Sequence, residues 1–185
     1  MLFKSALLAA LASTAYGHGT ITSPQARTPG SAMNSACGSI TTKFYQADNT
    51  SYPEALHRAN PRGLGSDYNA DKCNLYLCRG YQFSDNSKNV FNYKTGDKIP
   101  IHIWIRIPHN GYANVSVVDT TANKVIGTPL IDWPSGYANE KVYPNLPANQ
   151  TSFTVTVPDL GSSCTTAGQC VRMPRDRKNT AYCVY

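Results

Sequence analysis

The stretch Asp97–Pro108 reads DKIPIHIWIRIP, and it decides the fold class. Isoleucine occupies every second position from Ile99 to Ile107, and Pro, His, Trp and Arg fill the positions between. Successive side chains of a strand point to opposite faces, so a period of two places all the isoleucines on one face. The stretch therefore predicts a β-strand with one buried and one exposed face.

The flanking sequence repeats this theme. Val115 and Val117 alternate with polar residues after a turn at Asn110-Gly111, and the run from Phe153 to Val157 alternates with threonines before Pro158. The stretch 131–150 is rich in Gly, Pro, Asn and Ser, and we expect it to be irregular. No segment shows a long helical period, although 73–78 could hold a short helical turn. Short strands with turn-rich connections predict an all-β antiparallel sandwich.

The first seventeen residues resemble an export signal. A basic start is followed by the apolar run 5–12 and by small residues, which is the organisation of a secretory signal peptide and is too short to span a bilayer. Ala15-Tyr16-Gly17 satisfies the small-residue rule for cleavage and leaves His18 first, but Ser13-Thr14-Ala15 satisfies it too and leaves Tyr16. We expect residues 18–185 to form one domain of an exported protein without a membrane segment.

Six cysteines follow the leader, an even number that predicts disulfides in an exported protein. Proximity along the chain suggests Cys73 with Cys78 and Cys164 with Cys170, which leaves Cys37 for Cys183. Zinc is the competing interpretation, but no pair has Cys-x-x-Cys spacing and none adjoins a histidine. Sequons for N-glycosylation occur at Asn49, Asn114 and Asn149.

The charge of the chain gives little support for a nucleic-acid partner. The net charge of +6 becomes +5 when Lys4 leaves with the leader. Basic residues are scattered except in the run 172–178, and such a run is usually a solvated segment. We therefore expect no nucleic-acid binding.

Two of the four histidines are placed where a metal site could use them. An N-terminal His18 would offer its α-amino group and its imidazole, and His109 lies in a turn directly after the isoleucine-rich strand. Three nitrogens in a roughly planar arrangement favour copper. His102 lies on the strand face opposite the isoleucines, and His57 lies in a polar stretch that we expect to be a loop, so both are expected to be solvated surface residues.

Other chemistries have weaker support. The sequence contains no Gly-x-Ser-x-Gly, no His-Glu-x-x-His and no phosphate-binding glycine-rich loop. Asp119 and Asp132 could form a glycosidase pair, but nothing in the pattern selects them.

Several segments together resemble one enzyme family. His18–Arg27 (HGTITSPQAR) resembles the mature start of lytic polysaccharide monooxygenases, which opens with His-Gly and soon reaches Ser-Pro and an Arg. Three later blocks are similar to the fungal-type members grouped as auxiliary activity family 16: 33–38 (MNSACG), 71–83 (DKCNLYLCRGYQF) and 108–116 (PHNGYANVS). The likeness runs from His18 to about Val171, and it favours cleavage before His18.

The resemblance implies an immunoglobulin- or fibronectin-like β-sandwich with a copper site. His18 would match the N-terminal ligand, through amine and ring, and His109 would match the second imidazole. The implied activity is oxidative cleavage of cellulose or chitin by a monomer that receives electrons from an external donor. Tyr112, close to His109, is a candidate for contact with the sugar, although an ordinary loop tyrosine is an equally good interpretation.

The segment 171–185 departs from the family pattern. The family shows an aromatic strand here and then a tyrosine, about three residues before the last cysteine, in the axial position of the copper. In this chain three arginines and Pro174 replace the aromatic strand, and Tyr182 lies one residue before Cys183. A misread intron boundary near Val171 is the favoured explanation because the break is abrupt. The alternatives are a divergent copy that keeps copper without turnover, or Tyr182 filling the axial role from a shifted position.

Three functions therefore remain after the sequence: a copper-dependent polysaccharide monooxygenase, a secreted copper- or polysaccharide-binding protein without turnover, and a structural cell-wall protein without metal.

Overall fold

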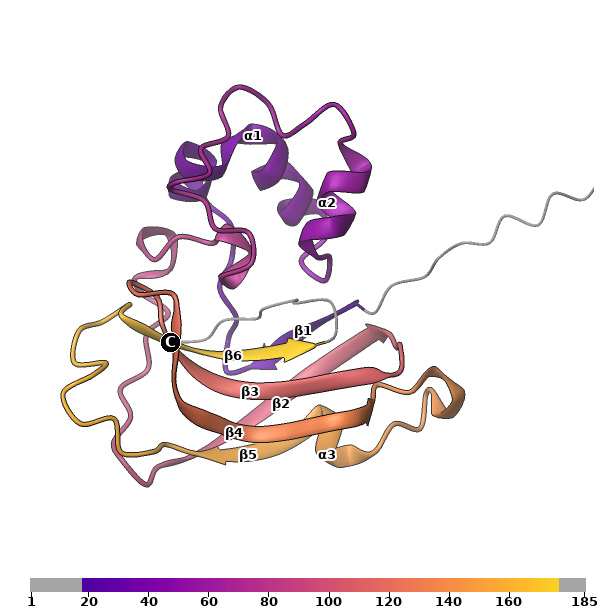
Figure 1. Ribbon diagram of the computed structural model, residues 1–185, viewed down its shortest axis with the longest axis vertical. Helices are drawn as coiled ribbons and strands as arrows, with labels where there is room; N and C mark the ends of the chain where they lie inside the picture. Colours follow the sequence, from indigo (N-terminus) through magenta and orange to yellow (C-terminus); the bar gives the residue numbers. More distant parts are fainter. Residues whose placement is uncertain (1–17, 177–185) are drawn as a thin grey trace, which may run out of the picture.

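The computed structural model describes residues 18–176, with side chains for residues 19–171. The chain forms two three-stranded antiparallel sheets and a helical region above them in Figure 1. The first sheet has the order β1 (His18–Ser23), β2 (Lys98–Ile107), β5 (Ser152–Thr156), and the second has the order β4 (Lys124–Tyr137), β3 (Gly111–Asp119), β6 (Cys170–Asp176). The helical region contains α1 (Ser31–Ala47) and α2 (Pro53–Ala59) and the short turns η1 (Cys78–Gly80) and η2 (Ser84–Asn86).

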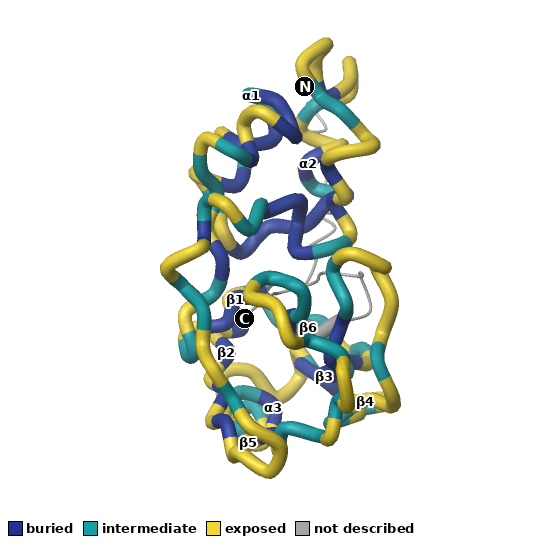
Figure 2. Tube along the Cα trace, turned by 90° about the vertical axis from the view of Figure 1, so that its left-hand side faces the viewer, coloured by how far each residue is buried: buried dark blue, intermediate teal, exposed yellow. Residues whose placement is uncertain are grey.

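The strand predictions around Asp97–Pro108 are confirmed. In β2 the isoleucines from Ile99 to Ile105 are buried, Ile107 is partly buried, and the residues between them are exposed. Strands β3 and β5 lie where the valine and threonine patterns predict them. The inner faces of the two sheets share one core, to which Ile101 contributes from β2, Val115 from β3 and Val155 from β5. Figure 2 shows the buried residues of the chain in dark blue and the largely exposed β4 in yellow.

The expected all-β, immunoglobulin-like sandwich is wrong, because the fold is mixed α/β. Helix α1 has buried residues at Met33, Ala36–Gly38, Thr41–Thr42 and Tyr45, which follow a helical spacing. Small residues and threonines dilute this pattern in the sequence, and Gly38, with φ +77°, kinks the helix in the middle. The chain from 24 to 95 therefore folds as a helical region, whose core also includes Val118 of β3 and Val171 of β6, and His57 lies in α2 rather than in a loop.

Both halves of α1 are capped by aspartates from far along the chain. Asp85 accepts hydrogen bonds from the backbone N–H groups of Ala32 (2.9 Å) and Met33 (2.8 Å). Gly30, directly before the first residue of α1, leaves room for this carboxylate, since a Cβ on Gly30 would lie 2.5 Å from the Asp85 Cγ. Asp67 accepts from the N–H of Ser39, directly after the kink, at 2.8 Å.

The predicted disulfide pairing is correct in one case. Cys164 is bonded to Cys170, as expected, but Cys37 is bonded to Cys73, so the pairs Cys73–Cys78 and Cys37–Cys183 are wrong. The cause is the path of the chain: the backbone of Asn69 donates to the carbonyl of Ala36 at 3.2 Å, which brings the following segment onto α1. Cys78 is disulfide-bonded as well.

The two strands that the sequence did not predict in the second sheet, β4 and β6, are its edges. Edge strands tolerate proline because one side of the strand needs no ladder hydrogen bonds. This explains why β4 accommodates Pro129 and, within the stretch expected to be irregular, Pro134. It also explains why Pro174 does not prevent β6 from pairing with β3. None of the helices within residues 18–176 has the length and apolar character needed to cross a membrane.

Candidate functional site

The pairing of β1 with β2 brings the two predicted ligand positions to one end of the sheets. The strands are antiparallel, and His18 lies opposite Ile107, the last residue of β2. Neighbouring strands lie about 5 Å apart, so the backbone of His18 is one strand spacing from a residue only two positions before His109. In Figure 1, β1 begins and β2 ends at the same end of the sheet.

The glycine after His18 is required by the close approach of these strands. A Cβ on Gly19 would lie 2.7 Å from the carbonyl oxygen of Trp104, which is closer than a real Cβ contact. The register also shifts between His18 and Gly19, so the first residue of β1 departs from the regular ladder. The His-Gly pair therefore has a structural reason in this chain.

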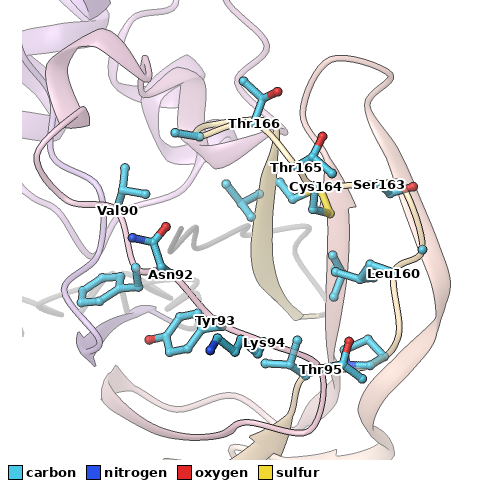
Figure 3. Close-up of a pocket in the computed structure, with 18 of the residues that line it drawn as sticks. Val90, Asn92, Tyr93, Lys94, Thr95, Leu160, Ser163, Cys164, Thr165 and Thr166 are labelled. Atoms are coloured by element: carbon cyan, nitrogen blue, oxygen red, sulfur yellow. A yellow bond between two sulfur atoms is a disulfide. The ribbon is translucent and has the colours of Figure 1, made fainter.

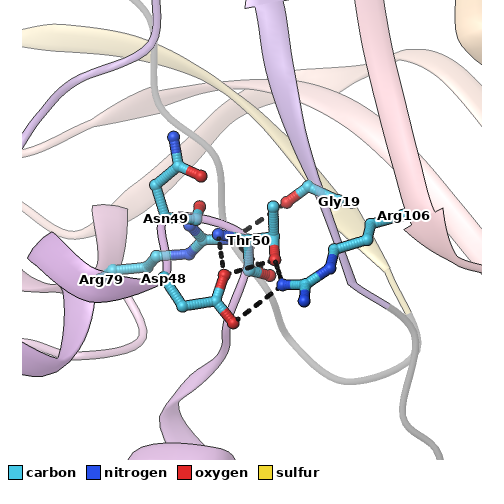
Figure 4. Close-up of polar contacts among 6 residues, drawn as sticks. All are labelled: Gly19, Asp48, Asn49, Thr50, Arg79 and Arg106. Atoms are coloured by element: carbon cyan, nitrogen blue, oxygen red, sulfur yellow. Dashed lines mark hydrogen bonds and ion pairs between the residues drawn. The ribbon is translucent and has the colours of Figure 1, made fainter.

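The start of β1 is tied to the helical region by Arg79, whose side chain is buried (Figure 4). Its guanidinium donates hydrogen bonds to the carbonyl oxygens of Gly19 (3.3 Å), Thr50 (3.4 Å) and Asn49. It also lies 5.9 Å from the centroid of the Tyr45 ring. A buried cation is costly unless it is well satisfied, so this set of acceptors fixes the backbone next to His18. The sequence carried no signal of this role.

A second arginine strengthens the same junction from the exposed side. Arg106, near the end of β2, forms an ion pair with Asp48 at 3.2 Å and donates to the hydroxyl of Thr50 at 3.2 Å. Asp48 caps the loop after α1, where it accepts from the N–H of Thr50 at 2.9 Å. The loop after α1 thus contacts β2 directly through Arg106, and Arg79 links the same loop to β1 at the end where His18 lies.

His109 occupies the turn between β2 and β3, as the sequence predicts, and its side chain is partly buried. Its Nε2 atom is buried and has no hydrogen-bond partner among the described residues. A buried ring nitrogen without a partner is uncommon and calls for an explanation, of which an ion is one. The side chain of His18 and the whole of Tyr182 lie outside the part of the chain that the structure describes.

A loop from the other sheet supports the turn. The N–H of Asn110 donates to a carboxylate oxygen of Glu140, in η3 (Glu140–Val142), at 2.6 Å. Hydrogen bonds from the backbone N–H groups of Glu140 itself and of Asn110 lower the pKa of this carboxyl, and the nearby His109 and Lys141 lower it further. Glu140 is therefore ionised at neutral pH beside His109. Sequence reasoning missed it because it lies 30 residues from Asn110 along the chain.

The loop that carries Glu140 is itself anchored by a buried glutamine. Gln150, in α3 (Ala148–Thr151), accepts from the N–H of Ala138 at 2.8 Å and donates to the carbonyl of Gly136 at 3.1 Å. The hydroxyl of Tyr137 donates to the backbone carbonyl of Gln150 at 3.2 Å. These contacts connect the end of β4 to the start of β5 and hold Glu140 near the turn.

The other candidate residues from the sequence lie away from the turn that holds His109 or from one another. His102 and His57 are exposed, as expected, and neither lies in the turn that holds His109. Asp132 pairs with Asn114 in the sheet whereas Asp119 pairs with Lys124. Five residues along β3 correspond to roughly 17 Å, too far for a glycosidase pair.

Tyr112, which follows the turn, is 46% exposed, as is Tyr143 after η3, so aromatic side chains are available to solvent near His109. Within residues 18–176, no group of three or more His, Cys, Asp or Glu side chains is placed to hold a metal. The candidate site would use another donor set: two imidazoles and one main-chain amine. No protein-family model matches this chain, and no curated protein matches it.

Proposed function

We propose that the chain is exported, is cleaved before His18, and binds one copper ion through the amine and imidazole of His18 and the imidazole of His109. The observation that carries the proposal is the β1–β2 register, which puts the backbone of His18 beside the strand end that leads into His109. The buried Nε2 of His109, without a partner among the described residues, supports the same assignment. The disulfides Cys37–Cys73 and Cys164–Cys170 support an oxidising destination.

The donor set suits the proposed ion. Nitrogen ligands in a tetragonal arrangement favour Cu(II), which also stands highest in the divalent affinity order. The amine binds only when it is neutral, and its ordinary pKa is about 8, so binding displaces a proton and affinity falls in acid. Arg79 fixes the backbone at Gly19, and Glu140 holds the turn at Asn110, so the chain orients both halves of the site.

We propose further that this site cleaves a polysaccharide of the cellulose or chitin class by oxidation, with electrons from an external donor. Bound copper would supply the activation of oxygen or peroxide that C–H oxidation requires. The residues of the chain would orient the ion and meet the sugar, and the exposed Tyr112 beside the turn offers a ring for such contact.

Copper affinity tests the site directly. In protein beginning at His18, His109→Ala should weaken copper binding by more than about 100-fold, since a direct ligand is lost. The matched control is His102→Ala, which removes an exposed histidine of β2, the strand before the turn, and should leave affinity unchanged. Calorimetry gives the affinities and thermal melting shows that both variants fold. An effect of His109→Ala smaller than threefold would reject His109 as a ligand.

The N-terminal half of the site has its own test. A variant with one alanine added before His18 keeps the imidazole but removes its α-amine from the chelate, so copper binding should weaken strongly. Unchanged affinity would mean that the amine is not a ligand. N-terminal sequencing of exported protein checks the cleavage position.

A binding protein without turnover is the second candidate, because the sequence after Cys170 departs from the pattern of the enzyme family. Incubation of copper-loaded protein with a reductant and cellulose or chitin separates the two. Oxidised oligosaccharides detected by mass spectrometry, absent with His109→Ala, support the enzyme. Copper binding without such products supports the binding protein.

A further inference from the structure

A cleft lies at the opposite end of the sheets from His109. Its volume is about 400 Å³, and it is lined by the segment 90–95, which leads into β2, and by the loop 157–168, which follows β5. In Figure 3, Asn92 and Tyr93 stand on one wall, and Leu160, Ser163 and Thr165 stand on the other. A volume of this size is within the range of small-molecule sites.

The walls are held in place by hydrogen bonds and a disulfide. At the base, the N–H of Gly96 donates to the carbonyl of Val157, and the N–H of Val157 donates to the carbonyl of Asp97, both at 2.9 Å. In the far wall, the Cys164–Cys170 disulfide closes the loop, and the hydroxyl of Thr120 donates to the carbonyl of Gly168 at 2.8 Å. The cleft is therefore formed before any ligand binds, which reduces the cost of ordering.

The chemistry of the lining favours an uncharged polar ligand with flat apolar faces. Phe91 and Tyr93 lie nearly parallel, with 6.0 Å between ring centroids and 23° between planes, and Phe91 is 37% exposed. The charged lining residues are one lysine, Lys94, and one aspartate, Asp159, so their charges balance. The amide of Asn92 and the hydroxyls of the opposite wall add donors and acceptors.

We propose that this cleft binds a short neutral oligosaccharide, with a pyranose ring stacked on Phe91 and its hydroxyls facing Asn92 and the loop 163–166. A sugar ring has an apolar C–H face and a polar rim, which matches an aromatic wall opposite a hydroxyl-rich wall. The site needs no metal and is separate from His18 and His109, so it goes beyond the proposed copper chemistry. It would give the protein a second attachment to a glycan.

Titration of metal-free protein with cellohexaose, and separately with chitohexaose, tests the proposal. Phe91→Ala should weaken binding of the bound hexaose about fivefold or more, because an exposed stacking surface is lost. Asn92→Ala should weaken it less. Tyr76→Ala is the matched control, since it removes a similarly exposed aromatic residue of the helical region, outside the lining of the cleft, and should leave the dissociation constant within twofold.

Three results would overturn the proposal: binding of neither hexaose at millimolar concentration, a dissociation constant unchanged by Phe91→Ala, or a loss of binding with Tyr76→Ala in place of Phe91→Ala. Thermal melting confirms that each variant folds, which is expected because both rings are exposed. Copper affinity should be unchanged in Phe91→Ala, and hexaose affinity should be unchanged in His109→Ala. The two measurements therefore test the cleft and the copper site independently.

Discussion

The two sheets and the helical region differ in how far along the chain their stabilising contacts reach. Strand β2 has a buried face because its own residues alternate, and its burial can be read from ten consecutive letters. Helix α1 follows a glycine, takes its caps from Asp85 and Asp67, and is bonded through Cys37 to Cys73. The helical region therefore depends on contacts between distant residues, and its local sequence carries only a weak pattern.

The largest expected effect comes from removing the disulfide of the helical region. Cys37 and Cys73 are separated by 36 residues, whereas Cys164 and Cys170 are separated by 6. Because the unfolded chain gains more freedom when a longer loop opens, replacing both cysteines of the first pair by serine should cost about 4 kcal/mol of unfolding free energy, against about 2 kcal/mol for the second pair. Urea denaturation measures both values.

Hydrogen exchange on the same variants sharpens the comparison. Without Cys37–Cys73, the amides of α1 and α2 should exchange faster while those of β2 and β5 keep their protection, since the buried residues of these two strands belong to a separate core. Equal loss of protection in the sheets would show that the helical region and the sheets unfold as one unit.

This difference in range also explains what the sequence could predict. The strands β2, β3 and β5 followed from alternation, and the turn position of His109 followed from the end of β2. The helix α1 did not follow, because its first cap comes from Asp85 and because Thr41 and Thr42 dilute its buried face between Met33 and Tyr45.

The candidate site divides in the same way. The candidate ligands His18 and His109 were proposed from the sequence, since the expected cleavage would expose the first and the second follows the clearest strand. Arg79 and Glu140, which hold the backbone on either side, were not. Their roles depend on partners 60 and 30 residues away, and no local spacing indicates such contacts.

A medium effect is expected at the first cap of α1. Asp85→Ala removes the acceptor for the N–H groups of Ala32 and Met33 and should cost about 1–2 kcal/mol of unfolding free energy. Asp85→Asn keeps one acceptor oxygen and should cost less. If Asp85→Ala melts at the same temperature as the parent protein, the distant cap is not what fixes the start of the helix.

The smallest effect concerns the second cap and depends on pH. Hydrogen bonds from the backbone and side chain of Ser39 lower the pKa of the Asp67 carboxyl from its usual value of 3.8. A carboxyl whose pKa is lower in the folded than in the unfolded state contributes stability above the unfolded value, and this contribution is lost as the pH falls through the folded value. Asp67 is exposed, so solvent screens the contribution and keeps it small.

Asp67→Asn removes this titration while keeping an oxygen that can accept from Ser39. The parent protein should therefore be slightly more stable than Asp67→Asn at pH 7, and the difference in unfolding free energy should shrink as the pH falls below 3.8. Urea denaturation of both proteins between pH 2 and 7 measures it. A difference that stays constant with pH would mean that the Asp67 charge does not act on α1, and that the second half of the helix depends on other distant contacts such as the Asn69–Ala36 hydrogen bond and the Cys37–Cys73 bond.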